Sequence, residues 1–568
     1  MKKIKKPVLI LYPPFEGRFF LKSRLPFPIG PLTIASFLTS NGIECHVKDF
    51  SYPAVKTLSK RPKGVNTKGG YYRYGASDVD ILAWLETNLP KYHKSIGISS
   101  LMSTCYHSAY NLARLVKSVS TDCETIIGGP HACINPEHVT NCKHIDKVCL
   151  GEGEIPFYDY LVKGKSKYIV DAGSVRRGSR NCELSDMDTL QHMDRRLLLD
   201  DRKVDHMMVA FSRGCPQHCT FCTSFLIQGR RWRHMSAERA VDMVVHLQKE
   251  WDVHQFEIED DNLCPGSEGI RWLTEFCKLV GIKKEEGELL SKTRFHVPHG
   301  LPVHSVATAG IADMLWAAGF RDMVFPVEST DRAVLKEMRK GGTPENWRKA
   351  NRAWNKYEKK VPVEVIIGYP FVQSIATMLR TFMDIADEGG LIWASHFRLN
   401  TRTLLFDRCV DAGYVKGDYD PLSMNSFSIE TERFTIADLL CLLRISRGIN
   451  FGTTSGFNSF RDDPAQMNKG LLKFTFKKKL AKGSAIAHGS FGFLKGQSTF
   501  ASIVASRMIG TELEPIIGTS DSKKELLYQG SRPNRVFAAL HLLLEESNLI
   551  CGGVRVDKGL LNFMGGVK

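Results

Sequence analysis

The chain has 568 residues, 43% of them hydrophobic and 24% charged, and a formal net charge of +16. This length predicts two to four domains of ordinary globular composition. The positive charge favours an acidic partner such as nucleic acid, an anionic lipid surface or a phosphorylated substrate, although a solvated basic surface explains it equally well. The 15 cysteines are scattered, and neither a signal peptide nor an 18-residue apolar run is found. We therefore expect a cytoplasmic protein without a transmembrane segment.

The first 150 residues alternate short apolar runs with amphipathic stretches. The runs predict strands at 7–12, 43–49, 95–100, 125–130 and 147–150, and the stretches predict helices at 29–40 and 107–119. Such an alternation is typical of a doubly wound, Rossmann-like parallel sheet, which binds ligands at the carboxyl ends of its strands. Glycines are expected there because they let a ligand approach the backbone, and Gly128, Gly129, Gly151 and Gly153 follow two of these strands.

A second series of strand–helix units follows a polar connector that contains an expected loop at 173–180. Its predicted strands are 206–211, 256–259, 294–297, 322–327, 363–367 and 391–397, and its clearest helices are 237–251, 311–318 and 331–339. Six such units predict a partial (β/α)6 barrel rather than the eight-unit closed form. Polar and glycine residues gather at the strand ends, where α/β barrels carry their chemistry.

Three cysteines in one short loop are the strongest chemical signal of the chain. Cys215, Cys219 and Cys222 have the spacing C-x3-C-x2-C, and three thiolates this close can hold three irons of a [4Fe–4S] cubane. The fourth iron then has an open position that can bind a small molecule. A structural zinc site is the alternative, with His218 or Cys264 as the fourth ligand.

This motif, with Phe221 just before the last cysteine, resembles the cluster motif of radical S-adenosylmethionine (SAM) enzymes. The resemblance implies that Cys215, Cys219 and Cys222 ligate the cluster. It also implies that the open iron chelates SAM, and that an electron from the cluster cleaves SAM to a 5′-deoxyadenosyl radical.

The segment ahead of the motif is similar to the cobalamin (B12)-binding domain that precedes many radical SAM enzymes. The similarity rests on Tyr12-Pro13-Pro14, Pro28-Ile29-Gly30-Pro31-Leu32, Gly128-Gly129-Pro130-His131 and Gly151-Glu152-Gly153-Glu154. It places the nucleotide tail of cobalamin near Ser99, Ser100, Gly128 and Gly129. The D-x-H-x-x-G motif, whose histidine ligates cobalt in some cobalamin proteins, is absent from the sequence. The lower ligand of cobalt stays open, and a flavodoxin-like domain without cobalamin is the alternative.

The resemblance also assigns SAM contacts along the barrel. Asp260 and Asp261 match the segment near the SAM amino group, and Glu328 and Ser329 match the one that reaches the ribose hydroxyls. Gly368 would lie near the adenine, and Arg233 would contact SAM or the substrate. Each of these residues has an alternative interpretation as a capped strand end or a solvated charge.

These observations predict a B12-binding domain at 1–165, a connector at 166–204, a radical SAM barrel at 205–415 and a mainly α C-terminal domain at 416–568 that selects the substrate. The resemblance implies a C-methyltransferase that uses a [4Fe–4S] cluster, SAM and methylcobalamin on a small or lipid-like, optionally anionic, substrate. Flavodoxin or ferredoxin would supply electrons. The alternatives are cyclisation, rearrangement or P-methylation, an RNA-modifying enzyme, and a zinc-containing nucleic-acid-binding protein.

Overall fold

The computed structural model describes residues 4–17, 27–59, 72–175, 181–358, 360–415, 419–421 and 429–453. The chain forms two compact units. Unit 1 comprises Met1–Met323 and Arg398–Ser428, and unit 2 comprises Val324–Phe397 and Ile429–Lys568. The division falls inside the segment predicted as one barrel. The predicted C-terminal domain at 416–568 lies outside the described residues except for 419–421 and 429–453.

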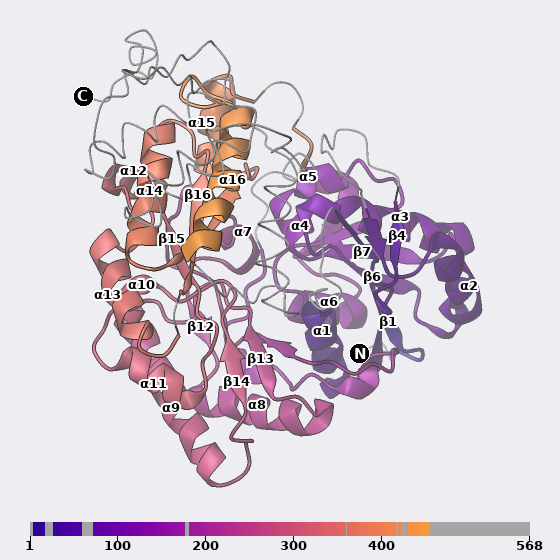
Figure 1. Ribbon diagram of the computed structural model, residues 1–568. Helices are drawn as coiled ribbons and strands as arrows, with labels where there is room; N and C mark the ends of the chain where they lie inside the picture. The colour runs from indigo at the N-terminus through magenta and orange to yellow at the C-terminus, as the bar shows by residue number, and fades with distance from the viewer. Residues whose placement is uncertain are drawn as a thin grey trace, which may run out of the picture. The chain divides into compact units, whose positions relative to one another are not determined.

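A six-stranded sheet with the order β3-β1-β6-β7-β8-β9 forms the N-terminal part of unit 1 (Figure 1). Its strands are β1 (Val8–Tyr12), β3 (Cys45–Asp49), β6 (Ser95–Ser99), β7 (Glu124–Gly128), β8 (Lys147–Cys149) and β9 (Ile169–Asp171). The first five are parallel, as the sequence predicts, whereas β9 pairs antiparallel with β8. The doubly wound sheet is therefore confirmed, with one unpredicted edge strand.

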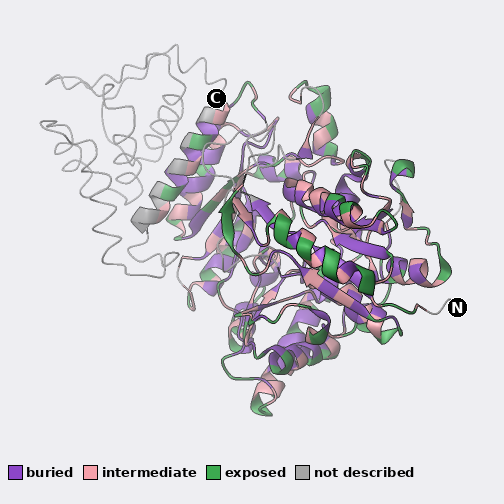
Figure 2. Cartoon of the chain, turned by 90° about the vertical axis from the view of Figure 1, so that its right-hand side faces the viewer, coloured by how far each residue is buried: buried purple, intermediate pink, exposed green. Residues whose placement is uncertain are grey.

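Helices cover both faces of this sheet, because alternate side chains of each buried strand point to opposite sides. Leu9 and Leu11 belong to a core that includes residues of α2 (Asp78–Asn88) and α3 (Tyr106–Val119). Ile10 and Tyr12 point the other way, towards α1 (Ile29–Ser40) and α6 (Glu154–Lys163). Figure 2 shows the buried strands between helices that carry exposed outer faces. The short helices α4 (Pro130–Ile134) and α5 (Pro136–Val139) follow β7.

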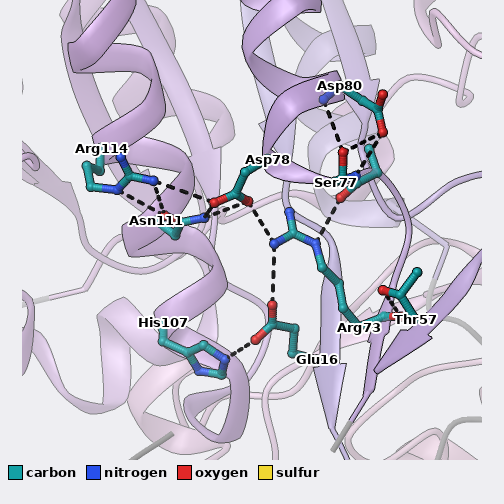
Figure 3. Close-up of polar contacts among 10 residues, drawn as sticks. Glu16, Thr57, Arg73, Ser77, Asp78, Asp80, His107, Asn111 and Arg114 are labelled. Carbon is teal, nitrogen blue, oxygen red and sulfur yellow. Dashed lines mark hydrogen bonds and ion pairs between the residues drawn. The ribbon is translucent and has the colours of Figure 1, made fainter. Parts of the chain in front are cut away.

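A small antiparallel sheet is inserted after β1, and the sequence patterns did not predict it. It has the order β2-β5-β4, from β2 (Phe15–Gly17), β4 (Lys56–Leu58) and β5 (Tyr72–Tyr74). Arg73 of β5 joins this small sheet to helix α2, because its guanidinium lies 2.8 Å from the Asp78 carboxylate, and it also lies 3.5 Å from the Glu16 carboxylate of β2 (Figure 3). Glu16 in turn lies 2.5 Å from His107 Nε2 on α3.

The rest of unit 1 begins with a three-stranded parallel sheet, β10-β13-β14. Its strands are β10 (Met207–Val209), β13 (Gln255–Ile258) and β14 (Arg294–His296). Its helices are α7 (Phe225–Gln228), α8 (Ala237–Trp251), α9 (Gly266–Glu285), α10 (Val303–Val306) and α11 (Ile311–Ala318). Ser236 begins α8, because its Oγ accepts a hydrogen bond from the Arg239 N–H at 3.2 Å. A short hairpin pairs β11 (Ser212–Arg213) with β12 (Arg233–His234).

A late segment of the chain returns to unit 1 and completes it. It contains α15 (Leu404–Asp411). Just before this helix, Arg402 Nη1 donates to the Cys133 carbonyl at 2.7 Å, and Thr401 Oγ1 bonds to the Asn135 side chain. Asn400 Nδ2 donates to the Phe221 carbonyl in the cysteine loop at 3.3 Å. Unit 1 is therefore built from two stretches that are far apart in the sequence.

Unit 2 contains the other three predicted barrel strands as a parallel sheet, β15-β16-β17. They are β15 (Phe325–Glu328), β16 (Pro362–Ile367) and β17 (Leu391–His396). The helices are α12 (Arg332–Met338), α13 (Pro344–Trp354), α14 (Ile375–Asp387) and α16 (Ile436–Thr453). All six strands of the second predicted series are thus present. None of the described helices is both long enough and apolar enough to cross a membrane.

Candidate functional site: an apolar cavity and a cysteine loop

An apolar cavity of about 140 Å³ lies at the carboxyl end of the six-stranded sheet. The sheet contributes Ile10, Gly97 and Ile126 to its wall, and the facing helices contribute Ile34 and Phe157. Of the residues predicted to receive the cobalamin tail, Ser99, Gly128 and Gly129 line the cavity, whereas Ser100 does not; Gly153, predicted as a strand-end glycine that lets a ligand approach, also lines it. The structure therefore brings together residues from three separate strand ends, as a ligand site at the edge of a parallel sheet requires.

Two buried hydroxyl groups at the cavity have no hydrogen-bond partner among the described residues. They are Tyr12 OH, on the cavity wall, and Ser100 Oγ, in the residue that follows Ser99. A buried hydroxyl without a partner costs free energy, so such groups usually mark a ligand or water position. Burial raises the pKa of the Tyr12 phenol well above its ordinary value, so Tyr12 is a neutral donor. An apolar wall with two available hydroxyls fits the nucleotide tail of cobalamin.

The glycines at this edge have two different roles. Gly129 has a φ of +101°, and a Cβ there would lie 2.9 Å from the Ser100 carbonyl oxygen, so the close approach of two strand ends requires glycine. Gly151 is not part of the cavity wall. A Cβ on Gly151 would lie 2.4 Å from the Cys182 backbone, so this glycine lets the connector pack against the strand end. Its predicted contact with cobalamin stays a prediction.

The histidine of the Gly-Gly-Pro-His motif is engaged by protein groups. His131 is fully buried; Nδ1 lies 3.1 Å from Ser103 Oγ, and Nε2 lies 3.1 Å from Tyr110 OH. Burial, with a smaller contribution from His138, lowers the pKa of His131 to about 3, so the ring is neutral. Both ring nitrogens have partners, and His131 therefore offers no free nitrogen to a metal.

The cysteine loop follows β11 and is closed by backbone hydrogen bonds. Cys215 N–H donates to the Gly229 carbonyl at 3.3 Å, and Cys222 N–H donates to the Cys219 carbonyl at 3.2 Å. Gly214 begins the loop with a φ of +85°, and a Cβ there would lie 2.2 Å from the Arg231 carbonyl oxygen. All three cysteines are half-buried, which leaves their sulfur atoms accessible to a cofactor.

Two residues contact the sulfur atoms of the loop: Asn262, which follows β13, and Ser224, which directly precedes α7. Asn262 Nδ2 donates to Cys215 Sγ at 3.7 Å. The Ser224 backbone N–H donates to Cys222 Sγ at 3.5 Å. Ser224 Oγ accepts from Cys222 Sγ at 3.3 Å and donates to Asp261 Oδ1 at 2.9 Å. Hydrogen bonds to cluster sulfurs set the reduction potential, so the donors at this loop suit an iron–sulfur cluster. No local pattern indicates a role for Ser224, because its contact with Asp261 spans 37 residues.

Asp260 and Asp261 differ although they are neighbours. Asp260 is buried; Oδ1 accepts the Phe211 N–H at 2.9 Å, and Oδ2 bonds to Ser212 Oγ. Burial raises the pKa of Asp260 to about 7. Asp260 thus ties β13 to the start of the cysteine loop, whereas Asp261 is exposed beside that loop. The contact with the SAM amino group stays a prediction for both.

Arg233 has protein partners that the sequence did not indicate. Its guanidinium makes two bonds to the Glu152 carboxylate, at 2.7 and 3.1 Å, and donates to the Leu184 carbonyl at 2.6 Å. Only 5% of the residue is exposed. The predicted role of Arg233 in contacting SAM or the substrate stays a prediction, and its observed role is to connect segments within unit 1.

Unit 2 carries the residues predicted to contact the ribose and the adenine. Glu328 ends β15 with a φ of +65°, and its Oε1 accepts a bond from Lys340 Nζ at 2.9 Å. Ser329 is buried, with Oγ 3.2 Å from Thr381 Oγ1. A Cβ on Gly368 would lie 2.7 Å from Leu439 Cδ1 of α16. The strained backbone of Glu328 is typical of a functional position.

The candidate metal ligands near the cysteine loop also bear on the alternative hypothesis of a structural zinc site. Cys264 is fully buried, and burial raises the pKa of its thiol to about 12. Within the part of the chain that the structure describes, no three His, Cys, Asp or Glu side chains are placed to hold a metal ion. A zinc site needs four ligands about 2 Å from one point, whereas a cubane spaces its cysteines more widely. The burial of Cys264 as a neutral thiol disfavours it as the fourth ligand of a zinc site.

Two family models match the chain in the order that the sequence predicts. The B12 binding domain matches residues 26–161, and the Radical SAM superfamily matches residues 209–383. The first match contains the cavity, and the second contains the cysteine loop.

Two curated relatives and one solved structure extend this result. The chain is 26% identical over 446 residues to a cytidylyl-2-hydroxyethylphosphonate methyltransferase of Streptomyces wedmorensis, covering 69% of this chain and 79% of the relative. It is 29% identical over 292 residues to an uncharacterized methyltransferase of Pyrococcus horikoshii, covering 48% of this chain and 60% of the relative. The cobalamin-dependent SAM radical enzyme OxsB shares the fold, with a TM-score of 0.63 at 16% identity, covering 99% of this chain and 83% of OxsB.

The cavity, the cysteine loop and the two family matches agree with one another. The cavity lies within the matched B12 binding domain, and the C-x3-C-x2-C loop lies within the matched radical SAM segment. The chain therefore carries an N-terminal B12 binding domain followed by a radical SAM domain.

Proposed function

We propose that this protein is a cobalamin-dependent radical SAM methyltransferase that methylates a small organic molecule. The observation that carries the proposal is the presence, in one compact unit, of a B12 cavity and a half-buried three-cysteine loop. When bound, the cluster supplies the electron that cleaves SAM, and cobalamin supplies a methyl group. The names of both curated relatives support methyl transfer over the other radical SAM reactions.

The residues of the chain position these groups. Cys215, Cys219 and Cys222 would ligate three irons, leaving the fourth open for SAM. Asn262 and Ser224 hold two of the sulfur atoms, and Asp261 orients Ser224. A side-chain base is not required for a radical hydrogen abstraction, so these residues need only orient and shield the reactants.

The remaining SAM contacts belong to unit 2. Glu328 would accept hydrogen bonds from the ribose hydroxyls, since a carboxylate is a pure acceptor. Lys340 Nζ donates a hydrogen bond to Glu328 Oε1 at 2.9 Å and so orients that carboxylate. Ser329, the next residue, would also reach the ribose hydroxyls, and Gly368 would lie near the adenine.

We place the reaction in the reducing cytoplasm, because free thiols must stay reduced until they bind iron. Flavodoxin or ferredoxin would deliver the electron. The substrate would be small and anionic, in keeping with the net charge of +16. The proposed domain bounds are 1–165 for the B12-binding domain and 205–415 for the radical SAM domain.

The test is anaerobic reconstitution with iron, sulfide and hydroxocobalamin, followed by turnover with SAM that carries a deuterated methyl group. The first substrate to assay is the cytidylyl-phosphonate named for the relative, and extracts of small metabolites follow. We expect 5′-deoxyadenosine and S-adenosylhomocysteine together, with the label in the product. Deoxyadenosine without S-adenosylhomocysteine would instead indicate cyclisation or rearrangement, and stoichiometric zinc without sulfide would contradict the proposal.

A further inference from the structure

Four charged side chains form a buried cluster in unit 1, which we call the charge anchor. It consists of Glu152 and Glu154, from the segment after β8, and of Arg213 and Arg233, from the β11–β12 hairpin. The exposed fractions of these side chains are 5%, 4%, 12% and 3%, respectively. Buried charges are costly unless they are paired and hydrogen-bonded, so the pairing inside this cluster matters.

The contacts within the anchor are specific. Arg233 makes a two-pronged contact with Glu152, at 2.7 and 3.1 Å. Arg213 divides its guanidinium between the two carboxylates, with Nη1 3.0 Å from Glu152 Oε2 and Nη2 2.7 Å from Glu154 Oε1. Burial alone would raise the pKa of Glu154, but the adjacent Arg213 outweighs it and lowers that pKa below its ordinary value. Two positive and two negative charges therefore neutralise each other.

The hairpin cannot satisfy these charges by itself. Arg213 and Arg233 are directly opposite in the antiparallel register of β11 and β12, and like charges in this position destabilise a strand pair. Glu152 removes the conflict by binding both guanidinium groups. The hairpin therefore depends on a carboxylate from the B12-binding domain.

The anchor joins the two cofactor sites along the backbone. Cys215 follows Arg213 by two residues, and Gly153, which lies between the two glutamates, lines the B12 cavity. The segment from Cys149 to Glu154 therefore contributes to the cavity wall and also holds the base of the cysteine loop by its carboxylates.

We propose that Glu152 and Glu154 are positioning residues that clamp the cluster-binding loop to the B12-binding domain through Arg213 and Arg233. The inference rests on the proposed ligation of the cluster by Cys215, Cys219 and Cys222, and it holds for any reaction that the enzyme catalyses. The clamp sets the position of Cys215 and so the stability and electronic environment of the cluster.

The test compares Glu152→Gln, Glu154→Gln and Arg213→Lys with the wild-type protein. Each is reconstituted anaerobically, and the rate at which an iron chelator removes the cluster is measured, together with the electron paramagnetic resonance spectrum of the reduced cluster. Loss of a residue that orients metal ligands typically weakens metal binding about 10- to 100-fold. We expect about tenfold faster iron loss and an altered spectrum for Glu152→Gln. Smaller changes are expected for Glu154→Gln and Arg213→Lys, because each leaves one arginine fully paired.

The matched control is Asp49→Asn, which breaks another buried ion pair of the same unit. Asp49 lies 2.8 Å from Arg202 Nη2, with exposed fractions of 0% and 7%, and its hydrogen bonds within the described part of the chain go to Ser51, Asp200 and Arg202 rather than to the cysteine loop. We expect it to lower the melting temperature about as much as Glu152→Gln does, but to leave the iron-loss rate and the spectrum unchanged.

Hydroxocobalamin binding, followed by absorbance, separates positioning from general structural support. The inference requires that Glu152→Gln binds cobalamin within about threefold of the wild type while losing iron faster. It is overturned if iron loss matches that of the wild type and the control, or if cobalamin binding and iron retention fall together in both glutamine variants. A wild-type protein that forms no cluster would instead contradict the proposed function.

Discussion

The B12 cavity and the cysteine loop lie in the same compact unit but are shaped by opposite means. The cavity exists because glycines at the strand ends have no side chains to fill it. These glycines and the apolar side chains around them enclose a cavity of about 140 Å³. The loop, in contrast, is stabilised by side chains: Arg213 and Arg233 at its base bind the buried carboxylate of Glu152, which is distant in the sequence. The cavity is enclosed by strand ends and the helices packed on them, whereas the loop depends on charged partners from other segments.

This difference determines how each site responds to change. Adding atoms to the cavity should block its ligand without disturbing the loop, because packed interiors do not expand easily. Removing a charge near the loop should displace cysteines without blocking the cavity. The predictions below test this separation, starting with the largest expected effect.

The most severe change replaces the three cysteines. The variant Cys215→Ala/Cys219→Ala/Cys222→Ala should bind no iron or sulfide and should form no 5′-deoxyadenosine from SAM, because the ligands of the cluster are gone. Cobalamin binding should stay within about twofold of the wild type if the two sites are independent. Iron analysis, product chromatography and an absorbance titration measure the three quantities, and a Cys277→Ala variant, altered at a buried helical cysteine, is the control.

The reverse change fills the cavity. Gly128 has ordinary backbone angles for an L-residue, and a Cβ there would lie 3.5 Å from Cys149 Cβ, so Gly128→Leu can be accommodated locally while its side chain enters the cavity. Overpacking of this kind costs about 2 kcal/mol, which corresponds to about 30-fold weaker cobalamin binding. The cluster content should be unchanged. Gly281→Leu, on α9 with no atom within 4 Å of its Cβ position, is the control, and equal cobalamin affinity of the two variants would contradict the assignment of the cavity.

A third variant, at Glu328, tests whether a buried carboxylate also contributes to the proposed SAM site in unit 2. Glu328→Gln should raise the KM for SAM about tenfold, because a ribose hydroxyl would lose a charged acceptor worth about 1.5 kcal/mol. Cobalamin binding and cluster content should not change. Glu388→Gln, at the end of α14 beside Arg352, serves as the control, and an unchanged KM would remove Glu328 from the ribose contact.

The smallest effect concerns pH. The pKa of Asp260 is about 7 in the folded protein against 3.8 ordinarily, so the folded state binds the proton more tightly than the unfolded state does. The contribution of Asp260 to stability should therefore be largest below pH 4 and should fall as the pH rises towards 7. Between pH 5.5 and 7 the loss is on the order of 2 kcal/mol. Asp260→Asn should flatten this slope in urea unfolding of the cluster-free protein, and an unchanged slope would assign it to other groups.

Local patterns predicted the elements that carry both sites. The runs at Val8–Tyr12, Ser95–Ser99 and Glu124–Gly128 are strands, and Ile29–Ser40 is a helix with the predicted bounds. Gly128, Gly129 and Gly153 of the cavity wall were predicted because they lie at strand ends, whereas Gly97, inside β6, was not. These features depend on residues within one or two turns of each other, so a single sequence contains the information.

The partnerships between distant residues could not be predicted. Arg233 lies 81 residues from Glu152, and Arg213 lies 59 residues from Glu154, so no spacing rule connects them. The sequence made Arg233 a candidate for SAM or substrate binding, because an isolated arginine near a cofactor motif gives no sign of its partner. The antiparallel insertion was missed for the same reason, since its strands have three residues each and pair across long intervals.

The discontinuity of unit 1 has a consequence for how the protein is made. During translation, residues 1–323 of this unit are synthesised well before the segment Arg398–Ser428 that completes it. Until then, the Cys133 carbonyl of α4 lacks its bond to Arg402, and the side chain of Asn135, which follows α4, lacks its bond to Thr401. The Phe221 carbonyl likewise lacks its bond to Asn400. Domains generally fold as units during synthesis. These three contacts, one of them to the cysteine loop, therefore form only after residue 402 has been synthesised.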